Sequence, residues 1–317
     1  MKNLNSKFIF FLICLGVLAV ASPALADETR TIRLKVAAFD NILFNDNFTV
    51  QSCPDNASST NLTVNAWCAV EQLVASQGWS ASSTWYSFGV MLNGINQYDG
   101  SDGNYWLWFS DSEPGATALN QHLLSDNENL LLTYGTSPLK ITASSIAPVI
   151  NSTSTLSAFY FDTNAWQWLA ATSTFVVNGQ EIASSSSAYE LWTSTTTPYT
   201  VFAKKDGFLN SEPVTIIPQL PTLNIGLRIE TASSTLFNQN LAVSACQNYA
   251  GSNIYTLNAW CAVEQVVSNQ GWSAASSWYS SSVFLNSINQ YDGSDGIYWL
   301  WFSNLDYGQT ALNSHIL

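Results

Sequence analysis

Alternating apolar and polar positions predict that most of the chain forms β-strands. Residues 31–39 alternate and are rich in β-forming side chains, which is typical of a strand. Apolar runs at 89–95 and 105–109 flank a Gly/Asp turn and resemble a hairpin, and 130–134 forms a further apolar run. The pattern therefore predicts a mainly β fold with α+β modules.

One segment has a helical period instead. Its apolar positions recur at i, i+3 and i+7, which places them on one face of a helix: Trp67, Val70 and Val74. Thr63 is expected to cap this helix, which would run over 64–77, and Gly78 is expected to end it. One helix packed on a mixed sheet of four or five strands is the order of a β-grasp domain.

A long internal repeat sets the domain plan. Residues 53–124 align with 246–317 without a gap at a constant offset of 193, and 47 of the 72 positions are identical. A repeat of this length indicates a duplicated domain rather than a solenoid unit. The segment between the copies is rich in Ser and Thr, with short alternating runs and Pro-containing ends. We expect four parts: a signal peptide at 1–26, a β-grasp domain at 27–135, a β-sandwich spacer at 136–218 and a second β-grasp domain at 219–317.

The second copy is expected to be truncated before its last strand. Residues 125–135 continue the first copy with an apolar strand, and nothing in the sequence follows 246–317 in the same way. The last strand of a β-grasp sheet usually lies centrally, so its absence would leave backbone groups unpaired. Two explanations stay open: the chain is a fragment of a longer protein, or another chain donates the strand.

The N-terminus has the pattern of an export signal. Lys2 and Lys7 precede the apolar run 8–20, and an Ala-Leu-Ala cleavage site ends at residue 26. An uncleaved membrane anchor is the alternative, but this run is shorter than the roughly 20 residues that cross a bilayer. The mature protein is therefore expected to be exported, secreted or held at the cell surface, with no membrane span after cleavage.

Composition and charge exclude several classes of function. The net charge is −13 and only 10% of residues are charged, so nine Lys plus Arg cannot supply the phosphate contacts of a nucleic-acid-binding protein. Two His and no recognisable nucleophile motif give no catalytic constellation, and no metal site or cofactor is expected. The sequence predicts a protein that is not an enzyme.

The cysteines predict two disulfides. Removal of the signal leaves four cysteines, in two pairs each 15 residues apart: Cys53, Cys68, Cys246 and Cys261. Four cysteines allow three connectivities, and a zinc site is a further alternative. Because each pair lies within one copy of the repeat, we expect pairing within each copy in an oxidising compartment.

Aromatic clusters supply the candidate ligand-binding residues. Trp106 and Trp108 share one face of a predicted strand, where an open row could stack on a sugar, a corrin-like ring or a partner. Trp85 and Tyr86 lie in a predicted loop between helix and strand. The second copy repeats both features: Trp278, Tyr279, Trp299 and Trp301. Packing in the core is the alternative for each of them.

The order of parts resembles a known family. The apolar helix is followed by Gly78-Trp79, by the Trp85-Tyr86 pair, by Asn93-Gly94 and by an aromatic strand. In this order each copy is similar to the transcobalamin-like C-terminal domain, a soluble-ligand-binding β-grasp module of bacterial surface proteins. Residues 175–179 and 199–208 resemble a carboxypeptidase-regulatory or prealbumin-like β-sandwich.

This resemblance implies a binding function. It predicts an exported module that binds a small soluble ligand, a corrinoid or a glycan, or a surface protein, with cobalamin as the family precedent. The cobalamin carriers hold their ligand with an additional helical domain, and no segment of this sequence resembles it. The alternative is a structural or adhesive array of tandem domains at the cell surface.

Overall fold

The computed structural model describes residues 28–317 except 57, 184–185, 250, 253 and 293–297. The predicted signal peptide at 1–26 lies outside these residues. The described chain is mainly β, as the alternating pattern predicts. Contacts divide it into two compact units, one formed by residues up to 138 with 207–209 and the other by the remaining residues to 317. In the described part, no helix is long and apolar enough to cross a membrane.

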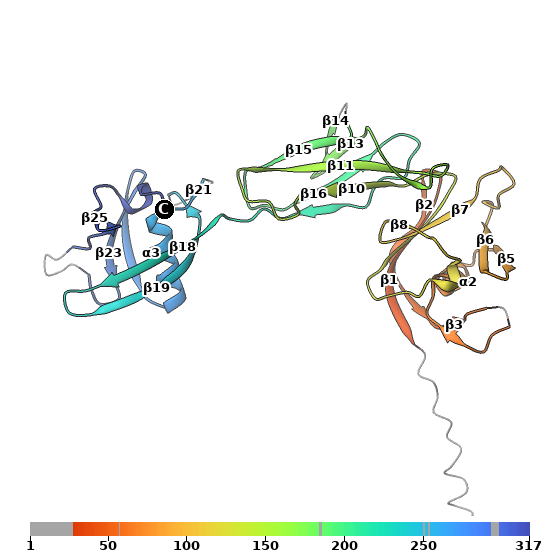
Figure 1. Ribbon diagram of the computed structural model, residues 1–317, viewed down its shortest axis with the longest axis horizontal. Helices are drawn as coiled ribbons and strands as arrows, with labels where there is room; N and C mark the ends of the chain where they lie inside the picture. The colour runs from red at the N-terminus through yellow and green to blue at the C-terminus, as the bar shows by residue number, and fades with distance from the viewer. Residues whose placement is uncertain (1–27, 57, 184–185, 250, 253, 293–297) are drawn as a thin grey trace, which may run out of the picture. The chain divides into compact units, whose positions relative to one another are not determined.

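The first unit holds one long helix and a mixed sheet (Figure 1). Its elements are β1 (Thr29–Ala38), β2 (Asn41–Gln51), β3 (Cys53–Pro54), β4 (Leu62–Thr63), α2 (Ala66–Gln77), β5 (Ala81–Tyr86), β6 (Gly89–Ile95), β7 (Trp106–Ser110), β8 (Glu113–Pro114), the 3₁₀ turn Leu119–Gln121 and β9 (Asn129–Tyr134). The sheet order is β2-β1-β9-β7-β8, with β9 parallel to β1 and antiparallel to β7. The closing strand of the first copy is therefore central, as expected.

Helix α2 begins two residues later than the sequence predicts. Thr63 lies in β4, where it pairs with Cys53, and so it cannot cap the helix. Asn65 caps it instead, accepting a hydrogen bond from the backbone N–H of Cys68 at 3.0 Å. Gly78 ends the helix in the left-handed conformation, with φ of 65°, as predicted.

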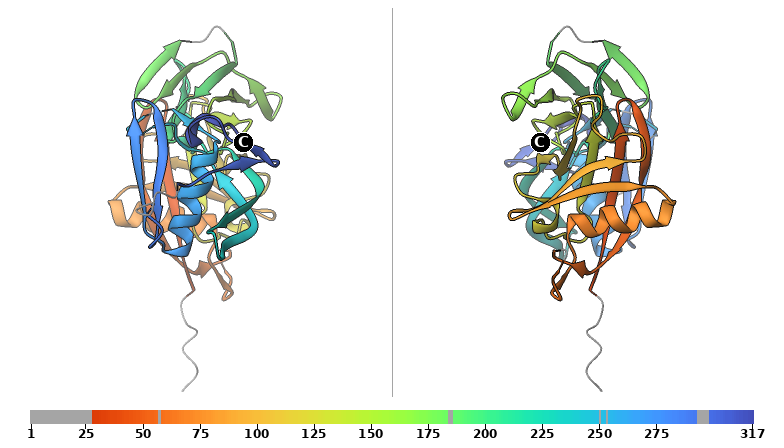
Figure 2. Two further views of the ribbon diagram at one scale, coloured as in Figure 1. Left: turned by 90° about the vertical axis from the view of Figure 1, so that its left-hand side faces the viewer. Right: turned by 90° about the vertical axis from the view of Figure 1, so that its right-hand side faces the viewer.

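A continuous hydrophobic core joins helix and sheet in the first unit. Leu34 and Val36 of β1, Trp67 and Leu73 of α2 and Leu132 of β9 are all buried within it. Helix α2 lies across β1 and β2 (Figure 2), and the Gln72 side chain hydrogen-bonds both backbone groups of Gln51. The helix is thus fixed to the sheet by apolar burial and by these two bonds.

The middle of the chain forms two four-stranded sheets. One contains β10 (Leu139–Ala143), β11 (Ser152–Asp162), β12 (Gln167–Ala170) and β15 (Ala188–Thr193), with β11 central. The other has the order β14-β13-β16-β17, from β13 (Thr174–Val177), β14 (Gln180–Ala183), β16 (Tyr199–Lys204) and β17 (Val214–Ile216). Each sheet contributes fully buried apolar side chains, Leu156 and Phe161 from one and Phe175 and Ile216 from the other.

The second copy repeats the first element by element. It holds β18 (Thr222–Glu230), β19 (Thr235–Ser244), β20 (Cys246–Gln247), β21 (Tyr255–Thr256), α3 (Ala259–Gln270), β22 (Ala274–Tyr279), β23 (Ser282–Ile288), β24 (Phe302–Ser303), β25 (Asp306–Tyr307) and the 3₁₀ turn Leu312–Ser314. The pairing register of the first two strands is also the same in both copies. Arg33 pairs with Asn47 in the first copy, and Gly226 pairs with Asn240, 193 residues further on, in the second. Among the described residues, however, β18 pairs with β19 alone, and no strand occupies the position of β9.

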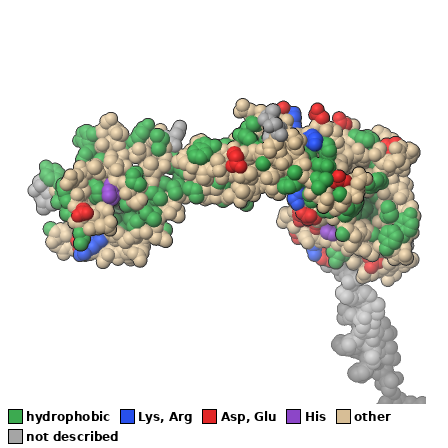
Figure 3. Space-filling view, turned by 45° about the horizontal axis from the view of Figure 1, so that its top comes forward, with side chains coloured by type: hydrophobic (Ala, Val, Ile, Leu, Met, Phe, Trp, Pro, Cys, Tyr) green, Lys and Arg blue, Asp and Glu red, His purple; other side chains and the backbone are tan. Residues whose placement is uncertain are grey.

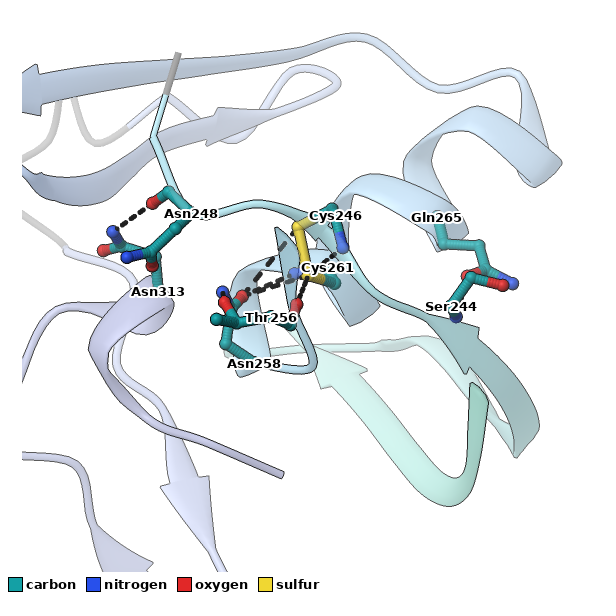
Figure 4. Close-up of a disulfide and its surroundings, with 8 residues drawn as sticks. All are labelled: Ser244, Cys246, Asn248, Thr256, Asn258, Cys261, Gln265 and Asn313. Carbon is teal, nitrogen blue, oxygen red and sulfur yellow. Dashed lines mark hydrogen bonds between the residues drawn. A yellow bond between two sulfur atoms is a disulfide. The ribbon is translucent and has the colours of Figure 1, made fainter. Parts of the chain in front are cut away.

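Both predicted disulfides are present. Cys53 is joined to Cys68 and Cys246 to Cys261, with Cα–Cα distances of 5.6 and 5.4 Å. Each bond ties the strand before the helix to the first turn of the helix. Figure 4 shows the second site, where Asn258 caps the helix and Asn313 donates a hydrogen bond to the Asn248 carbonyl. Pairing within each copy is confirmed.

Candidate functional site

The β5–β6 hairpin presents two different faces. Trp85 pairs with Val90 across the hairpin, and both side chains face the core under α2. Tyr86 follows on the opposite face, where it is 49% exposed. The predicted loop at Trp85 and Tyr86 is therefore wrong: both residues lie on a strand, and its alternation separates them.

A cleft lies between helix α2 and strand β5. It is shallow and largely open to solvent, with a volume of about 350 Å³. The helix contributes five residues along one of its faces, at positions i, i+3, i+4, i+7 and i+8 counted from Trp67. The strand contributes two small residues, Ala81 and Ser83. The lining residues are Trp67, Val70, Glu71, Val74, Ala75, Ala81 and Ser83.

Trp67 is the most deeply buried of the polar side chains that line this cleft. The side chain is only 4% exposed, and its ring meets that of Trp85 edge-on at a centroid distance of 6.2 Å. Its indole N–H is buried and has no hydrogen-bond partner among the described residues. A buried donor without an acceptor costs about 1–3 kcal/mol, and the Trp67 nitrogen is enclosed by its neighbours, so an acceptor reaches it only after they move.

Glu71 lies one helical turn after Trp67 on the same stripe, with its carboxylate exposed to solvent. In the second copy, burial raises the pKa of the equivalent Glu264, and the nearby Trp260 indole partly offsets this rise. The Trp260 N–H nevertheless makes no hydrogen bond of normal geometry in the described part of the chain. In the second copy the Trp260 N–H therefore lies close enough to Glu264 to interact with its carboxylate, and Glu71 occupies the equivalent helix position in the first copy.

The second copy retains the geometry around this pair. Trp260 is buried, and its ring meets Trp278 at 6.2 Å and 83°, against 6.2 Å and 84° for Trp67 and Trp85. Trp278 is half-buried against the core, so it does not form the open loop site that the sequence predicts. The arrangement is therefore a repeated feature of the fold.

The predicted open aromatic row is a packed layer. Trp106 is 9% exposed within the core, and its indole N–H donates to the Tyr98 carbonyl at 3.0 Å. In the second copy, Trp299 makes the same bond to Tyr291 at 3.3 Å and is half-buried. Of the two alternatives that the sequence leaves open for Trp106, the structure shows packing in the core, where its ring contacts that of Tyr134 at a centroid distance of 5.3 Å.

Trp108 and Trp301 are also covered, although less deeply. A Cβ atom on Gly115 would lie 1.9 Å from the Trp108 ring, so the glycine backbone packs directly against this indole. His122 contacts the same ring, with a centroid distance of 4.9 Å. Trp301 packs in the same way against Gly308 and His315. Neither indole offers an open face of the kind that stacks on a sugar ring.

Exposed aromatic pairs occur instead on the outer face of each hairpin. Tyr86 stacks on Phe88 with a centroid distance of 5.1 Å and an angle of 3° between the rings. In the second copy Tyr279 meets Phe284 edge-on at 5.7 Å. All four rings are exposed, so each copy presents an aromatic pair to solvent. Of the eight predicted aromatic residues, only Tyr86 and Tyr279 are exposed in the described structure.

The sequence analysis did not identify Trp67, Glu71 and Ser83 as site residues. One signal was available: Trp67 and Glu71 lie in the block NAWCAVEQ, which is identical in both copies although Glu71 faces solvent. Ser83 gave no signal, because its place in the cleft depends on how the hairpin packs against the helix.

Comparison with known proteins gives little guidance. No protein-family model matches the chain, and no curated protein matches it. Among solved structures, one match is a "putative metal binding protein" from Ruminococcus gnavus, with 14% identity over 33% of this chain and 95% of that one. Its TM-score is 0.23, too low to support an argument. Within the described ranges, no three His, Cys, Asp or Glu side chains gather as metal ligands would.

Proposed function

We propose that this chain is an exported, non-enzymatic binding protein whose two β-grasp repeats flank a β-sandwich spacer, and that each repeat binds a small ligand between its helix and its hairpin. The observation that carries the proposal is the cleft itself, lined by the Trp67 side chain, whose buried indole N–H has no partner in the described structure. The helix on a mixed sheet with a central last strand supports the β-grasp assignment. The two disulfides support export, since they persist in oxidising compartments.

The cleft chemistry favours one class of ligand. The indole donates one hydrogen bond, the Glu71 carboxylate accepts one, and Val70 and Val74 provide apolar walls. Adjacent hydroxyl groups of a sugar residue supply an acceptor and a donor on one edge. A corrin macrocycle is broader than a cleft of about 350 Å³, so a terminal sugar of a glycan fits this site better.

An NMR titration of the mature protein against single sugars, short glycans and cobinamide tests the proposal. The Trp67 indole N–H resonance, assigned by its loss in Trp67→Phe, is expected to shift on addition of a sugar. Glu71→Gln is expected to weaken binding to the first repeat at least tenfold, while Glu113→Gln, a second exposed carboxylate, is expected to leave it unchanged. If no ligand of the panel shifts this resonance, or if Trp67→Phe binds as well as the native protein, the cleft is not the site.

A surface-protein partner is the second candidate function. The exposed pairs Tyr86–Phe88 and Tyr279–Phe284 favour it, because tyrosine and phenylalanine are enriched in interface cores. Figure 3 shows hydrophobic side chains at the surface of the molecule, with acidic and basic side chains in small scattered groups. Tyr86→Ser with Tyr279→Ser is expected to abolish binding to such a partner and to leave the sugar titration unchanged.

A further inference from the structure

The chain contains four Asn-x-Ser/Thr triplets, which are the acceptor signal for N-linked glycans in exported proteins. They begin at Asn47, Asn56, Asn61 and Asn151. All four lie in the first copy of the repeat or in the segment that follows it, and no such triplet begins after residue 151. The structure decides between them, because a glycan needs an exposed side chain whose amide nitrogen is not already engaged.

Two of these asparagines hold a loop together. The Asn61 amide nitrogen donates to Asp55 Oδ2 at 2.7 Å, and that of Asn56 donates to Asp55 Oδ1 at 3.0 Å. Hydrogen bonds from Ser59 and Asn61 lower the pKa of the Asp55 carboxyl. A sugar on either nitrogen would crowd this carboxylate, so the loop is not the site.

Asn47 lies exposed on β2, the edge strand of the first sheet. Phe48 packs against the core, so Asn47 and Thr49 point to the opposite, solvent-facing side of the strand. The side-chain nitrogen of Asn47 has no hydrogen-bond partner among the described residues. A sugar attached here would extend into solvent without displacing a packed group.

Asn151 is exposed in the turn before β11, with φ of 60°. Its backbone N–H donates to the Thr193 carbonyl at 2.6 Å, which sets it beside strand β15. One residue earlier on that strand, Trp192 pairs with Thr153 and is 55% exposed. Paired residues of neighbouring strands share one face of the sheet, so the acceptor triplet and the exposed indole lie together. The indole face offers the first sugar an apolar surface on which to stack.

The second copy keeps one of these asparagines without the signal. Asn240 occupies the register position of Asn47 and is likewise exposed on its strand, β19. Two residues later the second copy has Ala242 where the first has Thr49. The repeat therefore presents the same asparagine in two equivalent places, once with the acceptor signal and once without it.

We infer that Asn47 and Asn151 carry N-linked glycans in the exported protein, and that the first sugar on Asn151 rests on Trp192. The side-chain nitrogen forms a bond to the anomeric carbon of a sugar that is activated as a glycosyl diphosphate on a lipid carrier. The bond from that carbon to the diphosphate oxygen breaks, the diphosphate leaves with the bonding electrons, and the nitrogen loses one proton. The inference rests on the export that belongs to the proposed function, and it does not depend on the cleft.

Glycopeptide mass spectrometry of the protein, purified from the cells that export it, tests the inference. Peptides that contain Asn47 or Asn151 are expected to carry added hexose or N-acetylhexosamine mass. Thr49→Ala and Thr153→Ala are each expected to abolish the glycan at the asparagine two residues earlier. Thr31→Ala is the matched control, because it removes the contact of 3.2 Å between the Thr31 and Thr49 hydroxyls but leaves the acceptor signal intact. It is expected to keep the glycan on Asn47.

A gain of modification complements these losses. Ala242→Thr completes the signal at Asn240 and is expected to add a glycan there, a result that misfolding cannot imitate. Proton NMR signals of the sugar on Asn151 are expected to be shifted upfield by the indole ring. Trp192→Ala is expected to remove this shift while the glycan stays attached.

The outcomes that overturn the inference are distinct from those that refute export. A mature protein that begins after residue 26 and carries no glycan at Asn47 and Asn151 overturns the inference and leaves the proposed export standing. A protein that retains residues 1–26 refutes export, and the inference with it. Sugar signals at Asn151 that are not shifted overturn the role of Trp192.

Discussion

Leu34 and Leu227 occupy the same position in the two copies and differ in what covers them. Leu34 is 0% exposed and faces β9 across the sheet, since it pairs with Leu130. Leu227 keeps the equivalent strand register opposite Gln239 but is only half-buried. Replacing each leucine by alanine therefore measures how much the central strand contributes to the burial of one side chain.

The expected costs follow from the burial. Leu→Ala removes three carbon atoms, which is about 2.4 kcal/mol at about 0.8 kcal/mol for each carbon, and the cavity left at Leu34 brings the cost to about 3–4 kcal/mol. At Leu227 part of the side chain already contacts water and no enclosed cavity forms, so we expect about 1–2 kcal/mol. Because the chain divides into two compact units, each repeat is followed separately by hydrogen exchange of its helix amides.

Equal costs at the two positions would refute this reasoning. They would mean that the greater exposure of Leu227 does not reduce what its side chain contributes to the free energy of unfolding. A matched control is available in Val70→Ala and Val263→Ala, because these helix positions are buried in both copies. Their costs are expected to agree within about 0.5 kcal/mol.

Three further predictions concern the first repeat. The Tyr134 hydroxyl donates to Asp102 at 2.5 Å and lowers the pKa of that carboxyl below 3.8. Tyr134→Phe should therefore raise the pKa of Asp102 in an NMR titration. It should also remove the stability that this bond contributes at neutral pH, which the native protein loses below about pH 4. Trp106→Ala should lower the free energy of unfolding by about 3–5 kcal/mol, while Tyr86→Ala should leave it within about 0.5 kcal/mol, as followed by denaturant unfolding. Gly78→Ala should cost about 1 kcal/mol in the same assay, because no contact within 4 Å compensates for its left-handed backbone.

Local features of the fold could be predicted from the sequence. The helix end at Gly78 depends only on the left-handed conformation that glycine adopts freely. The disulfide pairing followed from the repeat, because duplicated domains fold independently and pair their own cysteines. The central position of β9 also followed, since the order of elements along the chain constrains the sheet.

Features that depend on distant packing could not be predicted. Strand β5 consists largely of Ser and Thr, so its period-2 pattern is not visible in hydropathy, and Trp85 was assigned to a loop. For Trp106 the sequence left an open face and packing in the core as alternatives, because it does not show that the indole contacts Tyr134 of β9 and donates a hydrogen bond to the Tyr98 carbonyl. The cleft at Trp67 needs two packed elements, and neither of them alone indicates a site.

The duplication separates residues that serve the fold from residues that serve a site. Phe88 and Met91 of the first hairpin are replaced by Ser281 and Phe284 in the second. Both hairpins nevertheless expose an aromatic pair, which is stacked in the first copy and edge-on in the second. Glu71 and Glu264, in contrast, are identical although solvent reaches both and neither forms an ion pair in the described structure. An exposed helix position tolerates most polar residues at almost no cost in stability. Two roles account for the retained carboxylate: the ligand contact of the proposed function, and the contact with the indole one helical turn earlier, since burial raises the pKa of Glu264 and this contact partly offsets the rise.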